Sequence, residues 1–282
     1  MTVKIVTDSL SDITGDLIEE LGISVVPVYV RFGEEVFKDR VEITTEEFYH
    51  RLVYGNVWPT TTQPTPSDFA DVYRRLAQEA DEILVITLSS KLSGTYQSAV
   101  QARSMVKGGC RIEVIDSQQV VMGLGLIVIS AVKALRAGAG LDDLINLVHS
   151  AMKRVHSIMS FDTLKYLAKG GRIGKAQSLL GSMLSVKPIL ILKDGEVHPL
   201  TRVRSRAAGV DYLVNFVAGF ANHIEELAVE HATTPDEANA LVERLGAFYP
   251  KERIYQSTVS PVIGTYVGPH VLSVSVLEAE KK

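Results

Sequence analysis

The sequence predicts an α/β protein of two domains, and three observations support this prediction. Apolar, β-branched runs alternate with helix-like segments through the first half of the chain, which is typical of a parallel sheet covered on both faces. Near residue 155 the pattern changes to strands that include a hairpin. The 282 residues also exceed the usual domain size of roughly 100–150. We therefore expect an N-terminal α/β domain at 1–154 and a C-terminal α+β domain at 155–282.

The elements of the first half follow from apolar periodicity. Strands are expected at 3–7, 23–32, 82–88 and 111–116, and helices at 11–21, 45–54, 66–79, 93–106 and, with a glycine-rich break, 118–153. The helix at 66–79 has the clearest start, because Thr65 can cap it, Pro66 suits its first position and Asp68 lies three residues past the cap.

The second half is expected to be richer in strands. They are placed at 157–161, 188–200, 226–231, 253–259 and 269–278, with helices at 205–220 and 234–247. Within 188–200, Asp194-Gly195 is a hairpin signal, so this half is predicted to be an α+β unit built on a sheet that contains a hairpin.

Composition limits the classes of function. The net charge of −4 argues against a general nucleic-acid binder. The lone Cys110 fits a reducing compartment, and neither a secretory signal nor an apolar run of about 18 residues occurs. We expect a soluble, cytoplasmic protein, a monomer rather than an oligomer, with no nucleic-acid partner and no integral membrane segment.

Several familiar catalytic motifs are absent from the sequence. It contains no P-loop, HExxH, Cys-x-x-Cys or G-x-S-x-G motif, and its seven histidines lack metal-ligand spacing. We therefore expect no catalytic residue, no metal and no cofactor.

Three polar segments lie close to helix starts in the first half. They are VTDSLSD with Asp8 and Ser9, PTTTQPTPSDF with three threonines, and LSSKLSGTY with Ser93. Each can be explained by helix capping, but the hydroxyls outnumber the caps. Loops after the carboxyl ends of parallel strands gather at one edge of a sheet, where ligands bind. Neutral donors at such an edge would suit a bound carboxylate or phosphoryl group.

Two basic segments occur in the second half. In YLAKGGRIGKA, the pair Gly170-Gly171 before Arg172 is explained equally well by an anion-binding nest and by a helix C-cap followed by a turn. In TRVRSRAA, Arg202 and Arg204 alternate with Arg206 on one face of an extended stretch, which is either a functional face or a solvated edge strand.

Together with VIDS, SVKPIL and IGTYVGPH, these segments occur in the order and approximate spacing of the DegV family of bacterial fatty-acid-binding proteins, which the chain resembles almost from end to end. That family includes the lipid-binding subunit of fatty acid kinase, FakB. The resemblance implies the two-domain DegV-like (EDD) fold, with a long-chain fatty acid such as palmitate, stearate or oleate in a tunnel between the domains.

The resemblance also implies roles for individual residues. Thr61, Thr62 and Ser93 match the usual ligands of the carboxylate. Gly94, Thr95, Asp8 and Ser9 are expected around that head group. Arg172 and Arg204, with Arg202, Gly170 and Gly171, are expected to face an entering phosphoryl group or an acidic kinase surface. The chain would itself be non-catalytic and would present its ligand to a kinase subunit related to dihydroxyacetone kinase, which forms an acyl phosphate for phospholipid synthesis.

One segment departs from the family pattern. Many members carry THxGPG, whereas this chain reads TYVGPH, so Tyr266 replaces a histidine and His270 replaces the last glycine. A tyrosine hydroxyl can donate to a carboxylate but carries no positive charge. His270 is expected to compensate if it points inward.

Two other functions remain open. One is a lipid carrier or sensor without a kinase, which bound lipid without acyl-phosphate formation would favour. The other is an enzyme acting on a small hydroxylated or phosphorylated metabolite, which turnover without a partner protein would favour.

Overall fold

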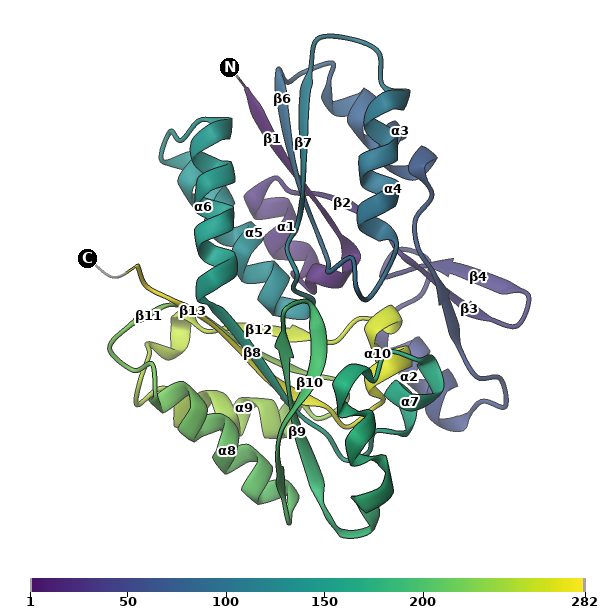
Figure 1. Ribbon diagram of the computed structural model, residues 1–282, viewed down its shortest axis with the longest axis vertical. Coiled ribbons are helices and arrows are strands. Elements are labelled where there is room, and N and C mark those ends of the chain that lie inside the picture. The colour runs from purple at the N-terminus through teal and green to yellow at the C-terminus, as the bar shows by residue number, and fades with distance from the viewer. Residues whose placement is uncertain (1, 281–282) are drawn as a thin grey trace.

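The computed structural model shows two lobes stacked along the long axis of the molecule (Figure 1). The structure describes residues 2–280, apart from the side chains of residues 181–185. The N-terminal lobe ends with α6 (Leu141–Arg154), and the C-terminal lobe begins with β8 (Val155–Ser160). Each lobe has its own main sheet, which confirms the predicted α/β class with an N-terminal parallel sheet. That each lobe folds as an independent domain stays a prediction.

The N-terminal lobe is built on a parallel sheet with helices on both faces. In spatial order its strands are β2 (Ser24–Val26), β1 (Val3–Asp8), β6 (Glu82–Thr87) and β7 (Arg111–Asp116). Alternate residues of a strand face opposite sides, so Ile83 packs toward α3 (Pro66–Leu76) and α4 (Thr95–Ala102), while Leu84 packs toward α5 (Val121–Arg136). The lobe also contains α1 (Gly15–Leu21) and α2 (Thr45–Tyr54).

The single strand predicted at 23–32 is wrong. Pro27 has no N–H for a sheet ladder, and the chain leaves the main sheet after β2. It then forms a separate antiparallel sheet in the order β4 (Glu35–Lys38), β3 (Tyr29–Phe32) and β5 (Thr60–Thr62). The three consecutive threonines form strand β5, because β-branched residues fit a pleated sheet. Pairing with β3 fixes the positions of its threonines.

The C-terminal lobe has a mostly antiparallel sheet covered on one face by α8 (Arg206–Ala218) and α9 (Pro235–Leu245). In spatial order its strands are β10 (Glu196–Val203), β9 (Lys187–Lys193), β8, β13 (Leu272–Glu278), β11 (Ile224–His231) and β12 (Tyr255–Thr258). Asp194 and Gly195 both have positive φ at the β9–β10 turn, which confirms the predicted hairpin. The sheet face opposite α8 and α9 carries Met159 and Leu190.

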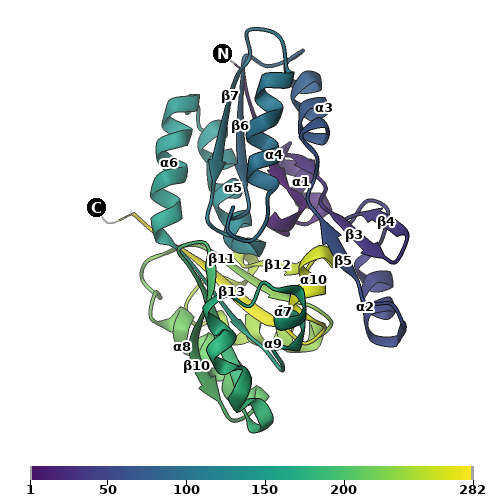
Figure 2. The same ribbon diagram turned by 45° about the vertical axis from the view of Figure 1, so that its right-hand side comes forward.

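Two short helices at the junction of the lobes are not evident from the sequence. They are α7 (Lys165–Gly170) and α10 (Pro261–Val267); α10 contacts both α7 and β5, and Figure 2 shows these elements near the junction. β-Branched residues such as Val262 and Ile263 favour strands, so the apolar pattern of α10 does not indicate a helix. A run of 3-10 turns, Gly174–Ser185, follows α7. Both α7 and α10 contribute residues to the wall of a cavity between the lobes.

Candidate functional site

A cavity of about 300 Å³ lies between the two lobes. Its wall is mostly apolar, and both lobes contribute to it. The most deeply buried wall residues, each no more than 3% exposed, are Leu10, Val28, Leu88, Val121, Phe161, Leu167, Leu190 and Val262. This volume lies at the lower end of the range for small-molecule pockets, which are themselves mainly apolar with a few placed polar groups.

The polar groups of the cavity are concentrated in its more exposed part, which we call the mouth. These residues are Thr61, Thr62, Gln63, Ser93, Arg172 and Tyr266. All six are half-buried or exposed, in contrast to the wall residues above. The arrangement is amphipathic: water can reach the polar end, while the remainder is enclosed by hydrocarbon.

Tyr266 joins the two lobes at the mouth. Its hydroxyl is hydrogen-bonded to the Thr61 hydroxyl, so β5 and α10 meet there. Gly170 makes room for the tyrosine ring, because a Cβ at that position would overlap it. The guanidinium carbon of Arg172 lies 5.1 Å from the ring centroid, within cation–π range. The charge that a tyrosine cannot carry is thus supplied beside it by Arg172.

Backbone contacts fix Arg172, but they exclude the proposed anion nest. Its Nη1 donates to the Gly170 carbonyl at 2.9 Å, and its Nε donates to the Leu92 carbonyl at 3.3 Å. The N–H of Gly171 donates to the Ala168 carbonyl, and that of Arg172 donates further back into α7. These two N–H groups form a helix C-cap and are not free for an anion. The C-cap alternative holds for the glycine pair, and the arginine side chain alone reaches the mouth.

Ser93 lies two residues before the start of α4 and lines the mouth. Its hydroxyl accepts the N–H of Thr95 at 3.3 Å and lies 2.9 Å from the Thr95 hydroxyl. Thr95 is fully buried and does not line the cavity, so it supports Ser93 from behind. The first turn of α4 adds a partial positive charge to the same place.

Gln63 is a mouth residue that sequence reasoning missed. Its side-chain amide packs against Gly94, where any Cβ would overlap it, and its Nε2 donates to the Ser98 hydroxyl at 3.4 Å. The signal was available, because Gln63 directly follows the three threonines and Gly94 follows Ser93. The close approach of these two segments requires tertiary structure and is not visible in either segment alone.

Asp8 and Ser9 are not brought to the mouth, contrary to the expectation from the sequence. Neither lines the cavity. Asp8 caps a 3-10 turn by accepting the N–H of Leu10 at 3.0 Å. The Ser9 hydroxyl donates to Asp39 at 2.7 Å. Both residues are buried and have structural roles. For Asp8 this is the capping role that the sequence also allowed.

His270 also lies elsewhere. It is exposed and borders a second hollow of about 430 Å³, which is lined by Trp58 and Tyr166 among others. The carbonyl of His270 accepts a hydrogen bond from Arg206. It therefore cannot compensate for the missing histidine at the mouth, where Arg172 lies beside Tyr266 instead.

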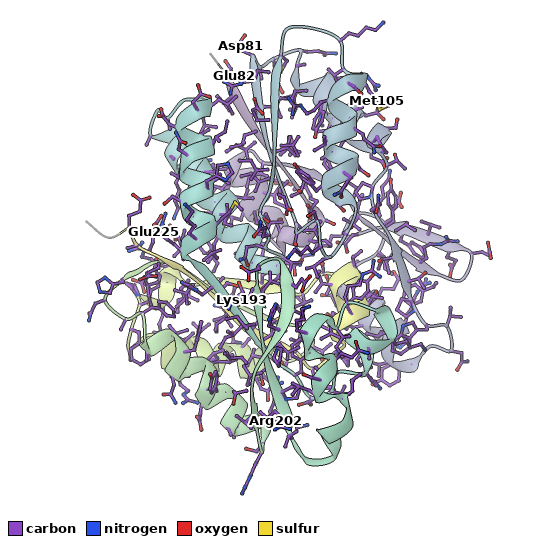
Figure 3. All side chains as sticks on the ribbon, viewed as in Figure 1. Asp81, Glu82, Met105, Lys193, Arg202 and Glu225 are labelled. Atoms are coloured by element: carbon purple, nitrogen blue, oxygen red, sulfur yellow. The ribbon has the colours of Figure 1, made fainter. Side chains whose placement is uncertain are left out.

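The other predicted arginines do not line the cavity either. Arg202 and Arg204 are exposed. Figure 3 shows Arg202 near the far end of the C-terminal lobe, whereas Lys193 at the start of the hairpin turn lies near the lobe junction. The three arginines do not share one strand face, because β10 ends at Val203 and Arg206 begins α8, where it pairs with Glu237.

Two further properties concern the described part of the chain, residues 2–280. No helix there is long and apolar enough to cross a membrane. Nor do three or more histidine, cysteine, aspartate or glutamate side chains in that part form a group that could hold a metal ion.

Comparison with known proteins agrees with this architecture. The DegV family of uncharacterised proteins matches residues 2–279. A DegV domain-containing protein from Caldanaerobacter subterraneus is 40% identical over 276 residues, which are 96% of this chain and 97% of the relative. The chain belongs to the DegV family. Its resemblance to that family is confirmed over nearly its whole length.

Solved structures of DegV proteins have the same fold. A DegV family protein from Thermus thermophilus, described by its fatty acid binding, is 33% identical, with a TM-score of 0.91 over 99% of this chain and 100% of the other. DegV from Bacillus subtilis, described as a fatty acid binding protein, is 31% identical, with a TM-score of 0.91 over 98% of this chain and 99% of the other. A stearic acid-binding protein from Eubacterium ventriosum is 25% identical, with a TM-score of 0.90 over 98% of both chains. Fatty acid binding is therefore a property of several structural relatives.

Proposed function

We propose that this chain binds one long-chain fatty acid in the cavity, with the carboxylate at the mouth and the hydrocarbon chain between the lobes. The observation that carries the proposal is the division of one cavity into a polar exposed end and an apolar buried remainder. The fatty acid binding of relatives at 33% and 31% identity supports it.

The energetics of such a ligand fit this division. A palmitate-sized chain has about fifteen buried carbons, and at roughly 0.8 kcal/mol per methylene its gross transfer free energy exceeds 10 kcal/mol. A carboxylate without partners would be strongly unfavourable in such a site. Thr61 and Ser93 offer the hydroxyl donors that it needs.

The direct test is mass spectrometry of lipids extracted from the denatured recombinant protein, and Thr61→Val is the matching variant. We expect wild-type protein to release a long-chain fatty acid. Valine has nearly the same shape as threonine but lacks the hydroxyl, so we expect Thr61→Val to bind the same acid about tenfold more weakly, as for a lost hydrogen bond to a charged group. Thr60→Val, in the same strand but outside the cavity wall, is the control. A wild-type protein that releases no fatty acid would overturn the proposal.

We further propose that a partner kinase phosphorylates the bound carboxylate. The kinase would transfer the γ-phosphoryl group of ATP to a carboxylate oxygen, releasing ADP and leaving an acyl phosphate in the cavity. Arg172 is the guanidinium placed at the mouth, and it would stabilise the added negative charge. Arg204, which lies outside the cavity wall, would contact the kinase itself.

Arg172→Ala is expected to lower acyl-phosphate formation with a cognate kinase subunit by at least about tenfold, because a charge-assisted bidentate donor is lost. The bound fatty acid should remain. Arg204→Ala tests the contact with the kinase separately. Arg75→Ala, at an exposed residue of α3, is the control for the loss of one positive charge. Unchanged phosphoryl transfer in Arg172→Ala would contradict the role of Arg172. Bound lipid without any acyl phosphate in wild-type protein would favour a carrier that acts without a kinase.

A further inference from the structure

Four carboxyl groups are buried together where the lobes meet. We call Asp8, Asp12, Asp39 and Glu230 the buried carboxyl cluster; none is more than 1% exposed. Asp8, Asp12 and Asp39 belong to the N-terminal lobe, and Glu230 lies on β11 of the C-terminal lobe. None of them lines the cavity, and the proposed function gives them no task. Buried carboxyl groups are costly, so their partners need an explanation.

Asp8 holds two segments of the cavity wall. Its Oδ1 accepts the N–H of Leu10 at 3.0 Å, and its Oδ2 accepts the N–H of Leu88 at 2.8 Å. Leu10 and Leu88 both line the cavity. One carboxyl group thus fixes the spacing of two wall segments that follow neighbouring strands of the same sheet.

Asp39 and Glu230 hold wall segments across the lobe boundary. Asp39 Oδ1 accepts the N–H of Val262, a wall residue of α10 in the other lobe, at 3.4 Å. Glu230 Oε1 accepts the N–H of Met122 at 3.2 Å, and Met122 directly follows the wall residue Val121 of the N-terminal lobe. Each lobe thus supplies one carboxyl group that accepts an N–H of the other lobe, so separating the lobes breaks both hydrogen bonds.

The charge in this cluster is unbalanced. Arg40 is the guanidinium that faces it, and Arg40 Nη2 lies 3.4 Å from Asp12 Oδ1. The Tyr49 hydroxyl also faces the cluster but donates to the Val259 carbonyl. Burial raises the pKa of Asp39 to about 7, although Arg40 and Ser9 oppose the shift. Burial and the neighbouring Asp12 raise the pKa of Glu230 as well. Ionisation of Asp39 near neutral pH therefore adds negative charge to the interface that the Arg40 guanidinium faces.

We propose that Asp39 and Glu230 are positioning residues for the cavity, and that their ionisation loosens the contact between the lobes and speeds exchange of the bound ligand. The inference rests on the proposed binding of a fatty acid. In the protonated state each group still accepts a wall N–H with one oxygen while carrying no charge. In the ionised state mutual repulsion among the carboxylates opposes closure of the lobes.

The test measures transfer of radiolabelled oleate from the protein to phosphatidylcholine vesicles between about pH 6 and about pH 8. Release from wild type should be about tenfold faster at the higher pH. This factor corresponds to a difference of about one pKa unit between the closed and the open state. Asp39→Asn should show a smaller increase in oleate release over this range, because its amide oxygen keeps the Val262 contact without ionising. Asp71→Asn, at an exposed residue of α3, controls for the loss of a carboxylate and for titration of oleate in the vesicle.

Identical pH profiles for wild type and Asp39→Asn would overturn the inference. Glu230→Gln is the second variant should Asp39→Asn fail to fold. Hydrogen exchange of the Val262 and Met122 amides in wild type gives a readout without any substitution: after correction for intrinsic exchange, their protection should fall as pH rises, and constant protection would count against the inference. Failure of wild type to retain oleate at any pH would refute the proposed function instead.

Discussion

Met159→Trp is expected to empty the protein of fatty acid while leaving it folded. Met159 is 7% exposed and lies in the cavity wall on β8, opposite its register partner Leu190 on β9, which also lines the cavity. An indole at this position would occupy space needed by the ligand. Displacing about four methylenes costs about 3 kcal/mol, a factor of roughly 100 in affinity. Mass spectrometry of extracted lipid and calorimetric affinity for oleate measure the loss.

Met159→Leu is the matched control, because it nearly conserves volume and should retain the ligand. The fold should survive Met159→Trp, since the ring fills a space that is not filled by protein atoms. Thermal unfolding checks this point. Wild-type levels of bound fatty acid in a folded Met159→Trp protein would show that the ligand does not occupy this cavity.

Local patterns were sufficient to predict most of the fold. The helix at 66–79 begins with the expected capping box, in which Thr65 and Asp68 bond to each other's backbone N–H groups. The Asp194-Gly195 hairpin is present as expected. The pattern failed at Pro27, where one apolar run serves two sheets, and at α10, where tertiary packing overrides the strand preference of its β-branched residues.

Some residues of the mouth could be predicted because clusters of hydroxyl-bearing residues and glycines are recognisable in the sequence. Thr61, Thr62, Ser93, Arg172 and Tyr266 do line one cavity, as the resemblance implied. Their binding roles stay predictions. The cavity wall leaves no comparable mark, since a valine or leucine beside a ligand looks the same in sequence as one in a core.

The pairing of Tyr266 with Arg172 shows why single positions were hard to interpret. From the sequence, Tyr266 removes a positive charge and His270 is the nearest candidate to restore it. In the structure Arg172 lies over the Tyr266 ring and His270 is exposed. Because a guanidinium keeps its charge at every physiological pH, the mouth is less sensitive to pH than one built on histidine would be. The groups that we propose to be pH-sensitive, Asp39 and Glu230, lie outside the cavity wall instead.

The buried carboxyl cluster should make the stability of the ligand-free protein fall as pH rises from about 4 to about 7. The pKa values of Asp8 and Asp39 rise from 3.8 to about 7 on burial. Between these values the folded state binds more protons than the unfolded state, so the free energy of unfolding decreases with pH and levels off above about 7. Each group accounts for on the order of 4 kcal/mol across that range. Urea unfolding at a series of pH values measures the curve.

Asp39→Asn isolates one contribution, because asparagine does not titrate. Its free energy of unfolding should therefore fall less steeply than that of wild type over the same range. Carboxylates with lowered pKa act in the opposite direction: Arg206 lowers the pKa of Glu237, whose stabilisation is lost as pH falls. That contribution is common to both proteins and cancels in their difference. Parallel curves for wild type and Asp39→Asn would mean that Asp39 ionises as freely in the folded chain as in the unfolded one, and Asp39 could then not be a pH-sensing group of the buried carboxyl cluster.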